Sequence, residues 1–178
     1  MKIVVVNGPA GAGKDLFVTF CAQFLGTDKI RNYSTVDYVK AIAAQIGWDG
    51  TKDLKNRKFL SDLKDVLTEW DDIPYRRTKI EITQFQHRLN ALGEEYNKNG
   101  VMFIHCRESE EIARFKEDYG AQTVLIRRES AENQEVSNHA DERVFEYKYD
   151  TVVYNNGTME DLREGAHTYL REVLKLDV

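Results

Sequence analysis

The sequence predicts an α/β fold of three layers, with helices on both faces of a five-stranded, mostly parallel sheet. Short apolar segments alternate along the chain with segments of helical periodicity, which is typical of repeated strand–helix–strand units. The first segment, Ile3-Val4-Val5-Val6, is an unbroken run of β-branched residues and indicates a strand buried on both faces. A glycine-rich loop and a helix follow that run directly.

The composition is that of a globular protein that folds as one unit. The 178 residues suffice for one domain with a sizeable core, so we expect residues 1–178 to form that domain. Hydrophobic residues make up 42% of the chain and charged residues 31%, as in ordinary soluble domains. The formal net charge of −5 gives no support to general nucleic-acid binding.

Several further features favour a cytoplasmic protein. The longest apolar runs are only as long as strands, so we expect no membrane span. The first strand begins at the N-terminus, with no charged region and apolar stretch before it, so we expect no secretory signal. Cys21 and Cys106 lie among apolar residues without C-x-x-C spacing, and we expect both to be reduced core residues.

Five predicted strands are short apolar segments, and turn residues separate them from their neighbours. They lie at residues 3–6, 29–33, 101–104, 122–126 and 150–154. Apolar residues at spacings of three and four predict the helices between these strands and after the last one. These helices lie at residues 16–25, 36–46, 54–70, 74–97, 109–119 and 158–173. Parallel strands place their carboxyl ends at one edge of the sheet, where ligands bind.

Polar residues mark the start of three of these helices. Ser34 is expected to lie in the N-cap region of the second helix, with Asp37 three residues later. Asp72 is expected to cap the helix that begins at Pro74. Thr158 is expected to cap the last helix.

The segment from Gly8 to Lys14 fits the pattern G-x-x-x-x-G-K between a strand and a helix, which is the context of a phosphate-binding loop. A helix N-terminus offers unpaired N–H groups and a partial positive charge. Glycines let the backbone wrap closely around an anion, and Lys14 adds a charge for the β- and γ-phosphates. The residues expected to bind the nucleotide are Gly8, Ala10, Gly11, Ala12, Gly13, Lys14, Asp15 and Leu16.

Asp15 follows the lysine, at the position where a Ser or Thr hydroxyl normally binds Mg²⁺. Carboxylate oxygen also suits a hard cation, so we expect Asp15 to help hold Mg²⁺, either directly or through water. The alternative is a glycine-rich turn without chemistry, and the flanking strand and helix argue against it.

Basic residues follow two other predicted strands. Arg107 comes after the third strand, and Arg127 and Arg128 end the fourth. Arginine binds phosphate oxygens bidentately, so guanidinium groups gathered beside a phosphate loop favour phosphoryl transfer to a phosphorylated acceptor. Local ion pairs with neighbouring glutamates are the alternative for each arginine. We interpret His105, at the end of the third strand, as a core histidine rather than a catalytic base.

The sequence lacks the motifs of two other classes of nucleotide-binding protein. A guanine-specific protein needs a late N-K-x-D-like motif, and Asn155-Asn156-Gly157-Thr158 is not one. A large ATPase would end an apolar strand in Asp-Glu, whereas the third strand runs into His105-Cys106-Arg107-Glu108. These absences favour the small-molecule kinases.

These features together resemble the P-loop nucleoside monophosphate kinases. Gly13-Lys14-Asp15 is similar to the G-K-D ending of the loop in phage-type deoxynucleoside monophosphate kinases and in animal-type phosphomevalonate kinases. Further segments that resemble the phage-type enzymes are residues 33–43, 47–63 and 149–158, the last of which runs from an aspartate-led strand into N-x-G-T.

The resemblance implies a P-loop NTPase fold, ATP with Mg²⁺ as the donor, and a (deoxy)nucleoside 5′-monophosphate acceptor that becomes the diphosphate. It implies a substrate-side helical segment at about residues 34–97 and a short lid at about residues 128–143. By position, it places Ser34 and Lys40 at the acceptor, Arg107 at its phosphate, Arg127 or Arg128 at the transferring phosphoryl group, and Asn156 near the adenine.

Two alternative functions stay open. The first is a kinase for a non-nucleotide phosphorylated acceptor such as phosphomevalonate. The second is a non-catalytic nucleotide-binding regulatory module, which a large exposed apolar patch would favour. A small-molecule nucleotide is the expected partner, with no nucleic acid and no membrane, and the chain is expected to be a monomer or a homodimer.

Overall fold

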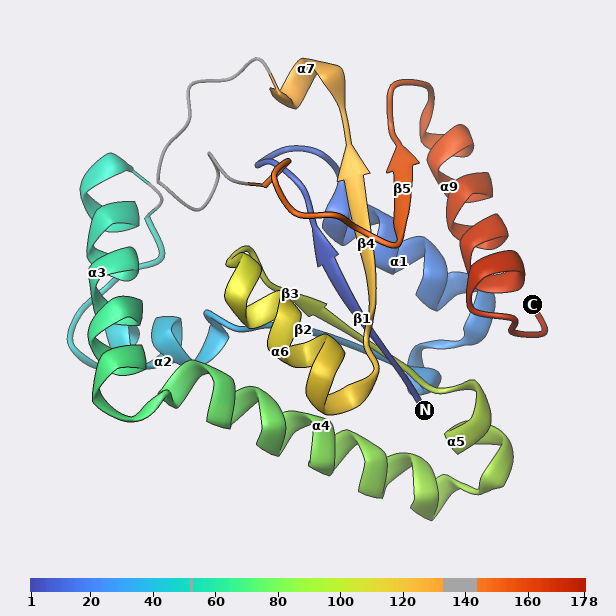
Figure 1. Cartoon of the computed structure of the whole chain (residues 1–178), viewed down its shortest axis with the longest axis horizontal. Coiled ribbons are helices and arrows are strands. Elements are labelled where there is room, and N and C mark those ends of the chain that lie inside the picture. The colour runs from blue at the N-terminus through green and yellow to red at the C-terminus, as the bar shows by residue number, and fades with distance from the viewer. Residues whose placement is uncertain (52, 133–143) are drawn as a thin grey trace.

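The computed structural model contains a five-stranded sheet of order β2-β3-β1-β4-β5, in which every neighbouring pair is parallel (Figure 1). It describes residues 1–51, 53–132 and 144–178. The strands are β1 (Lys2–Asn7), β2 (Ile30–Ser34), β3 (Val101–His105), β4 (Gln122–Arg127) and β5 (Thr151–Tyr154). The predicted fold class is confirmed, and the sheet is wholly parallel.

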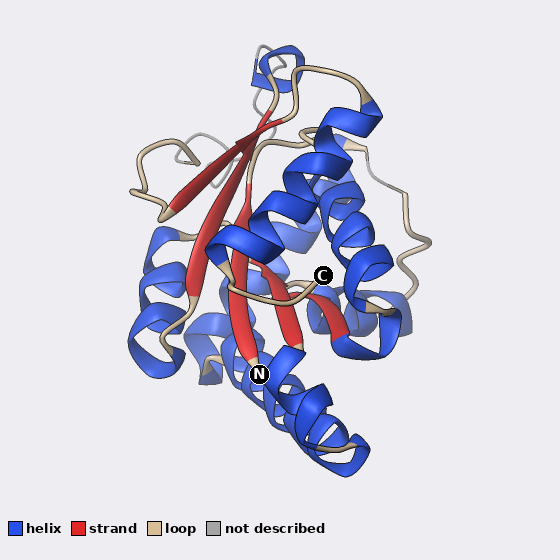
Figure 2. Cartoon of the chain, turned by 90° about the vertical axis from the view of Figure 1, so that its right-hand side faces the viewer, coloured by secondary structure: helices blue, strands red, loops and turns tan. Residues whose placement is uncertain are grey.

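Helices cover both faces of the sheet, which makes the three layers (Figure 2). They are α1 (Lys14–Leu25), α2 (Asp37–Gln45), α3 (Leu54–Asp71), α4 (Ile73–Leu92), α5 (Glu94–Asn99), α6 (Ser109–Tyr119), α7 (Glu129–Glu132) and α9 (Met159–Thr168). Two short turns complete the described elements, η1 (Thr27–Lys29) and the π-helical η2 (Tyr169–Val173). None of the described helices is both long enough and apolar enough to cross a membrane.

Strand β1 lies between two hydrophobic cores. Val4 and Val6 point to the core that contains α1 and α9, whereas Ile3 and Val5 point to the core that contains α4 and α6. Successive side chains of a strand alternate between its faces, so an unbroken apolar run is needed where both faces are covered. The β-branched run therefore predicts the central position of β1 correctly.

The helix predicted at residues 74–97 is two helices in the structure. The chain breaks at Gly93, whose φ of +120° is a backbone conformation that other residues rarely adopt. The spacing of apolar residues continues across the break and conceals it in the sequence.

The residues that cap the N-termini of the helices differ in part from those predicted. Ser34 ends β2, and Val36 is the N-cap of α2. Asp37 nevertheless accepts a hydrogen bond from the Ser34 N–H at 2.9 Å, so one half of the expected reciprocal cap forms. Thr158 is confirmed as the cap of α9, with Asp161 completing the reciprocal pair.

The apolar residues at the two ends of α3 are not buried. Leu54 and Trp70 are each 76% exposed, and Lys64 is the buried residue of this helix. The predicted cap residue Asp72 makes no side-chain cap; its carboxylate pairs with Arg114 of α6, with Nη1 and Oδ1 3.1 Å apart. Polar contacts therefore take part in the docking of α3, together with the half-buried Leu60, Leu63 and Leu67.

Candidate functional site

The glycine-rich loop lies where β1 passes into α1. Gly8, Gly11 and Gly13 have φ angles of +147°, +80° and +96°, values open to glycine and strained for other residues. Helix α1 begins at Lys14, directly after the loop, so the unpaired N–H groups of its first turn adjoin the loop. The predicted strand–loop–helix arrangement is present, and it can bind an anion at the carboxyl edge of the sheet.

The loop is packed closely against β4 and the end of β5. Asn155, which follows β5, is buried and donates a hydrogen bond from Nδ2 to the Ala12 carbonyl oxygen at 2.9 Å. A Cβ atom at Gly13 would lie 2.5 Å from that Nδ2, and one at Gly8 would overlap the backbone oxygen of Ile126. These glycines are required by close approach as well as by their φ angles.

We expect Gly13→Ala to lower the free energy of unfolding by about 1–3 kcal/mol and to weaken ATP binding. The new methyl would meet Asn155 and would force a φ of +96° to change. Gly26→Ala is the matched control, because Gly26 has a φ of +93° with no atom within 4 Å of a Cβ. Urea denaturation and ATP titration of both variants measure the difference. Equal losses of stability and ATP affinity in the two variants would contradict the importance of the Asn155 contact.

Lys14 lies across the loop. Its Nζ donates hydrogen bonds to the carbonyl oxygens of Gly8 at 2.6 Å and of Pro9 at 2.8 Å. These acceptors hold the ammonium charge at the loop, where the phosphates of a nucleotide are expected.

A polar cluster of Asp15, Asn32 and His105 borders the first turn of α1. The Nε2 atom of His105 lies 2.7 Å from Asn32 Oδ1 and 3.5 Å from Asp15 Oδ1. The side chain of His105 is 14% exposed, and burial lowers its pKa to about 4, so the imidazole is neutral at pH 7. His105 is largely buried and hydrogen-bonded, as predicted, but its neighbours are Asp15 in the first turn of α1 and Asn32 in β2.

Asn7 joins the loop to the end of β3. Its Oδ1 accepts a hydrogen bond from the Gly8 N–H at 2.8 Å, and its Nδ2 lies 3.4 Å from the Arg107 carbonyl oxygen. The same Nδ2 donates to the Tyr149 hydroxyl at 2.7 Å. The half-buried Arg107 is therefore beside the phosphate loop, as expected from the meeting of strand ends. The sequence alone did not indicate Asn7 or Tyr149.

The other predicted polar residues form local pairs near α7. Arg127 makes a bidentate ion pair with Glu132, with N–O distances of 2.9 and 2.7 Å. Asn156 exchanges two hydrogen bonds with Glu129, each of 2.9 Å, whereas the neighbouring Asn155 is the residue that contacts the loop. Arg128 is exposed. The phosphate and adenine roles of these residues stay predictions.

The predicted acceptor residues lie on the β2 side of the same edge. Ser34 ends β2 and pairs in register with His105. Lys40 forms an ion pair with Asp37 at 3.2 Å. Residues 133–143 of the predicted lid lie outside the described residues. The acceptor roles of Ser34 and Lys40 stay predictions.

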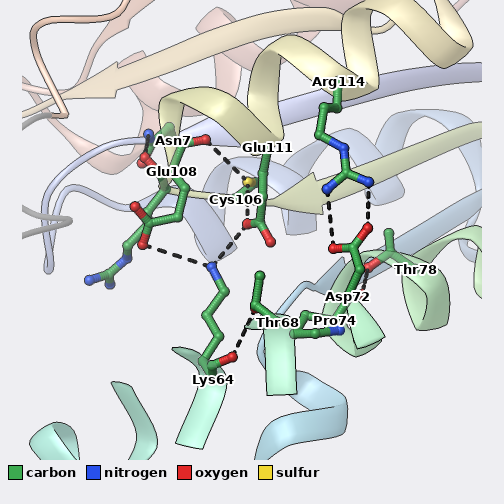
Figure 3. Close-up of polar contacts among 11 residues, drawn as sticks. Asn7, Lys64, Thr68, Asp72, Pro74, Thr78, Cys106, Glu108, Glu111 and Arg114 are labelled. Atoms are coloured by element: carbon green, nitrogen blue, oxygen red, sulfur yellow. Dashed lines mark hydrogen bonds and ion pairs between the residues drawn. The ribbon is translucent and has the colours of Figure 1, made fainter. Parts of the chain in front are cut away.

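A buried ion-pair cluster joins α3 to α6 next to Cys106, the residue that follows β3 (Figure 3). Lys64 Nζ lies 2.9 Å from Glu111 Oε2 and 3.8 Å from Glu108 Oε1. The Cys106 thiol donates to the same Glu111 oxygen at 3.2 Å, and burial together with Glu111 raises its pKa, so the thiol stays protonated. Burial opposes the charge of Lys64, but its anionic neighbours outweigh that effect and raise its pKa above the usual value. Cys106 is thus a free, buried thiol, as predicted.

The fit of a metal ion depends on Asp15. Within the ranges that the structure describes, no three or more His, Cys, Asp or Glu side chains gather in a way that could hold a metal. A Mg²⁺ ion bound with a nucleotide needs few protein ligands, because phosphates and water supply most of its oxygens. The Asp15 side chain, 88% exposed at the first turn of α1, suits that requirement.

Solved structures with a similar fold include small-molecule kinases. Shikimate kinase from Aquifex aeolicus vf5 has a TM-score of 0.50 at 14% identity, over 97% of this chain and 98% of that chain. An unliganded sugar kinase from Janibacter sp. HTCC2649 has a TM-score of 0.51 at 14% identity, over 96% and 94%. TT1252 from Thermus thermophilus has a TM-score of 0.57 at 16% identity, over 99% and 98%.

These similarities establish the fold. The chain has the three-layer α/β/α architecture with a parallel five-stranded sheet that these proteins share. No protein-family model and no curated protein sequence matches the chain significantly. The activity therefore has to be inferred from the residues at the carboxyl edge of the sheet.

Proposed function

We propose that this chain is an ATP-dependent kinase whose acceptor is a (deoxy)nucleoside 5′-monophosphate. The observation that carries the proposal is the link through Asn7, which brings Arg107 to the edge of the sheet that holds Lys14. In this proposal Lys14 and the Arg107 guanidinium supply positive charge at one edge for two phosphate groups, as transfer between phosphates requires. The fold shared with small-molecule kinases supports this reading.

Each residue of the edge has a defined task in this proposal. When bound, ATP supplies the transferable phosphoryl group and Mg²⁺ neutralises charge on the phosphate oxygens. The loop N–H groups and Lys14 bind the β- and γ-phosphates, and Asp15 helps hold Mg²⁺, directly or through water. Arg107 binds the acceptor phosphate, which is already a nucleophile, so a general base is not needed. Arg127 or Arg128 reaches the transferring group.

Residues 34–97, which begin with Ser34 and contain α2, α3 and α4, form the acceptor side in this proposal. Tyr38 and Arg77 from this segment stack on each other, with the guanidinium carbon 4.3 Å from the ring centroid. A flat aromatic side chain beside a guanidinium group is suited to contact a nucleobase.

The test is a panel of nucleoside and deoxynucleoside monophosphates incubated with ATP, Mg²⁺ and the purified chain. We expect ADP formation with at least one of them, well above that of a Lys14→Ala variant. Addition of phosphomevalonate to the panel separates the two classes of acceptor. No ADP above the variant with any monophosphate would contradict the proposal.

A regulatory module that binds nucleotide without turnover is the second candidate. The observation that favours it is the exposed apolar surface of α3, where Val66 is 61% and Trp70 is 76% exposed. Such a module would bind ATP tightly and release no ADP with any acceptor. The same apolar surface would also suit a homodimer, so sedimentation of the chain alone distinguishes self-association from a monomer.

A further inference from the structure

We propose that Asn32 and His105 are positioning residues that orient the Asp15 carboxylate toward the cation bound with the nucleotide. The inference deepens the proposed function and rests on it, because Asp15 meets that cation only when a nucleotide occupies the loop. Neither residue belongs to the phosphate-loop pattern, since Asn32 comes from β2 and His105 from β3.

The strand register brings both side chains to one face of the sheet. Asn32 pairs with Phe103, two residues before His105, so the three side chains share a face. Phe103 packs edge-on against Phe17 of α1, with ring centroids 6.3 Å apart. Asn32 and His105 therefore border the first turn of α1, where Asp15 lies.

The chemistry of the three side chains assigns each donor. Asp15 can only accept while ionised, so Asn32 Nδ2 donates to Asp15 Oδ1 at 3.5 Å. The amide oxygen of Asn32 then accepts from His105 Nε2 at 2.7 Å, and this nitrogen also lies 3.5 Å from Asp15 Oδ1. Both contacts meet Oδ1, which leaves Oδ2 to face a cation or its bound water.

Hydrogen bonds that fix an exposed carboxylate strengthen its binding to a cation. The side chain of Asp15 is 88% exposed, and a mobile side chain loses rotamer freedom when it binds a ligand. The Asn32 amide, itself held by His105, can fix the carboxylate without placing a positive charge beside the cation, as a lysine or arginine would. Groups that hydrogen-bond a metal ligand typically raise metal affinity by about 10- to 100-fold.

The test is the binding of Mn²⁺ to the protein–ADP complex, followed by electron paramagnetic resonance. Asn32→Leu is expected to weaken Mn²⁺ affinity about tenfold and to leave metal-free ADP affinity unchanged. Asn32 is exposed, so the fold should tolerate this change. Arg31→Ala is the matched control and should bind Mn²⁺ as wild type does, because Arg31 lies on the opposite face of β2 and pairs with Glu81.

Further variants separate orientation from packing. Glutamine keeps an N–H donor, so His105→Gln should retain much of the affinity that His105→Leu loses. Asn32→Leu added to Asp15→Asn should cause no further loss, because the contact acts through Asp15. The inference is overturned if Asn32→Leu binds Mn²⁺ within twofold of wild type, or if its effect adds fully to that of Asp15→Asn.

This experiment requires no acceptor, so the two proposals can fail separately. Absence of turnover with every acceptor, together with weakened Mn²⁺ binding in Asn32→Leu, contradicts the proposed function and supports the orienting role. Turnover with at least one acceptor, together with unchanged Mn²⁺ affinity in Asn32→Leu, supports the proposed function and contradicts the orienting role. A wild-type chain that binds no Mn²⁺ with ADP overturns both.

Discussion

Lys14→Ala is expected to lower kcat/KM for ATP by about a hundred- to a thousandfold, the usual effect of removing one pre-organised donor to a reacting group. Lys14 supplies the side-chain charge of the glycine-rich loop and contacts backbone oxygens of Gly8 and Pro9. Those hydrogen bonds are only partly buried, so water can replace the ammonium without large loss of stability. A coupled assay for ADP and a thermal denaturation curve measure the two effects.

A variant of an exposed basic residue shows whether the effect is specific. Arg171 forms a surface ion pair with Glu172 at 3.0 Å, and Arg171→Ala should keep both kcat/KM and Tm close to wild type. If Lys14→Ala retains kcat/KM within threefold of wild type, Lys14 does not bind the transferring phosphates. If Lys14→Ala unfolds at a much lower temperature, the lysine has a structural role instead.

Much of the fold could be predicted because its signals are local. The run Ile3 to Val6 is apolar on both faces and forms the central strand, and Thr158 with Asp161 caps the last helix within four residues. The break at Gly93 was missed, since a glycine within a periodic helix is compatible with either continuity or a break. The exposure of Trp70 was also missed, because periodicity identifies an apolar face without showing what covers it.

The candidate site could be predicted only where one continuous segment of the sequence forms it. The loop from Gly8 to Lys14 carries its own pattern and its own flanking elements. Asn155 meets the loop from 143 positions away in the sequence, and such a contact leaves no local signal. The pairing of Arg127 with Glu132 was likewise hidden, since an arginine at a strand end is as compatible with an ion pair as with a phosphate.

Lys64→Met is expected to lower the free energy of unfolding by about 3–5 kcal/mol, the usual result of breaking one side of a buried ion pair. The change leaves the carboxylate of Glu111, 8% exposed, without its cation. Within the described residues, Glu111 Oε1 has no hydrogen-bond partner. The Cys106 thiol would then be a weak remaining donor to Oε2. Urea denaturation at pH 7 measures the loss.

Two matched variants test whether burial of the ion pair causes the loss of stability in Lys64→Met. Lys58 on the same helix pairs with Asp62 on the exposed surface, so Lys58→Ala should cost less than about 0.5 kcal/mol. Glu111→Gln added to Lys64→Met removes both charges and should recover part of the loss. Because Lys64 is the buried residue of α3, amide exchange should rise more in α3 than in β1. A loss below about 1 kcal/mol for Lys64→Met would be far less than a buried pair predicts; other contacts, such as that between Asp72 and Arg114, would then be what holds α3.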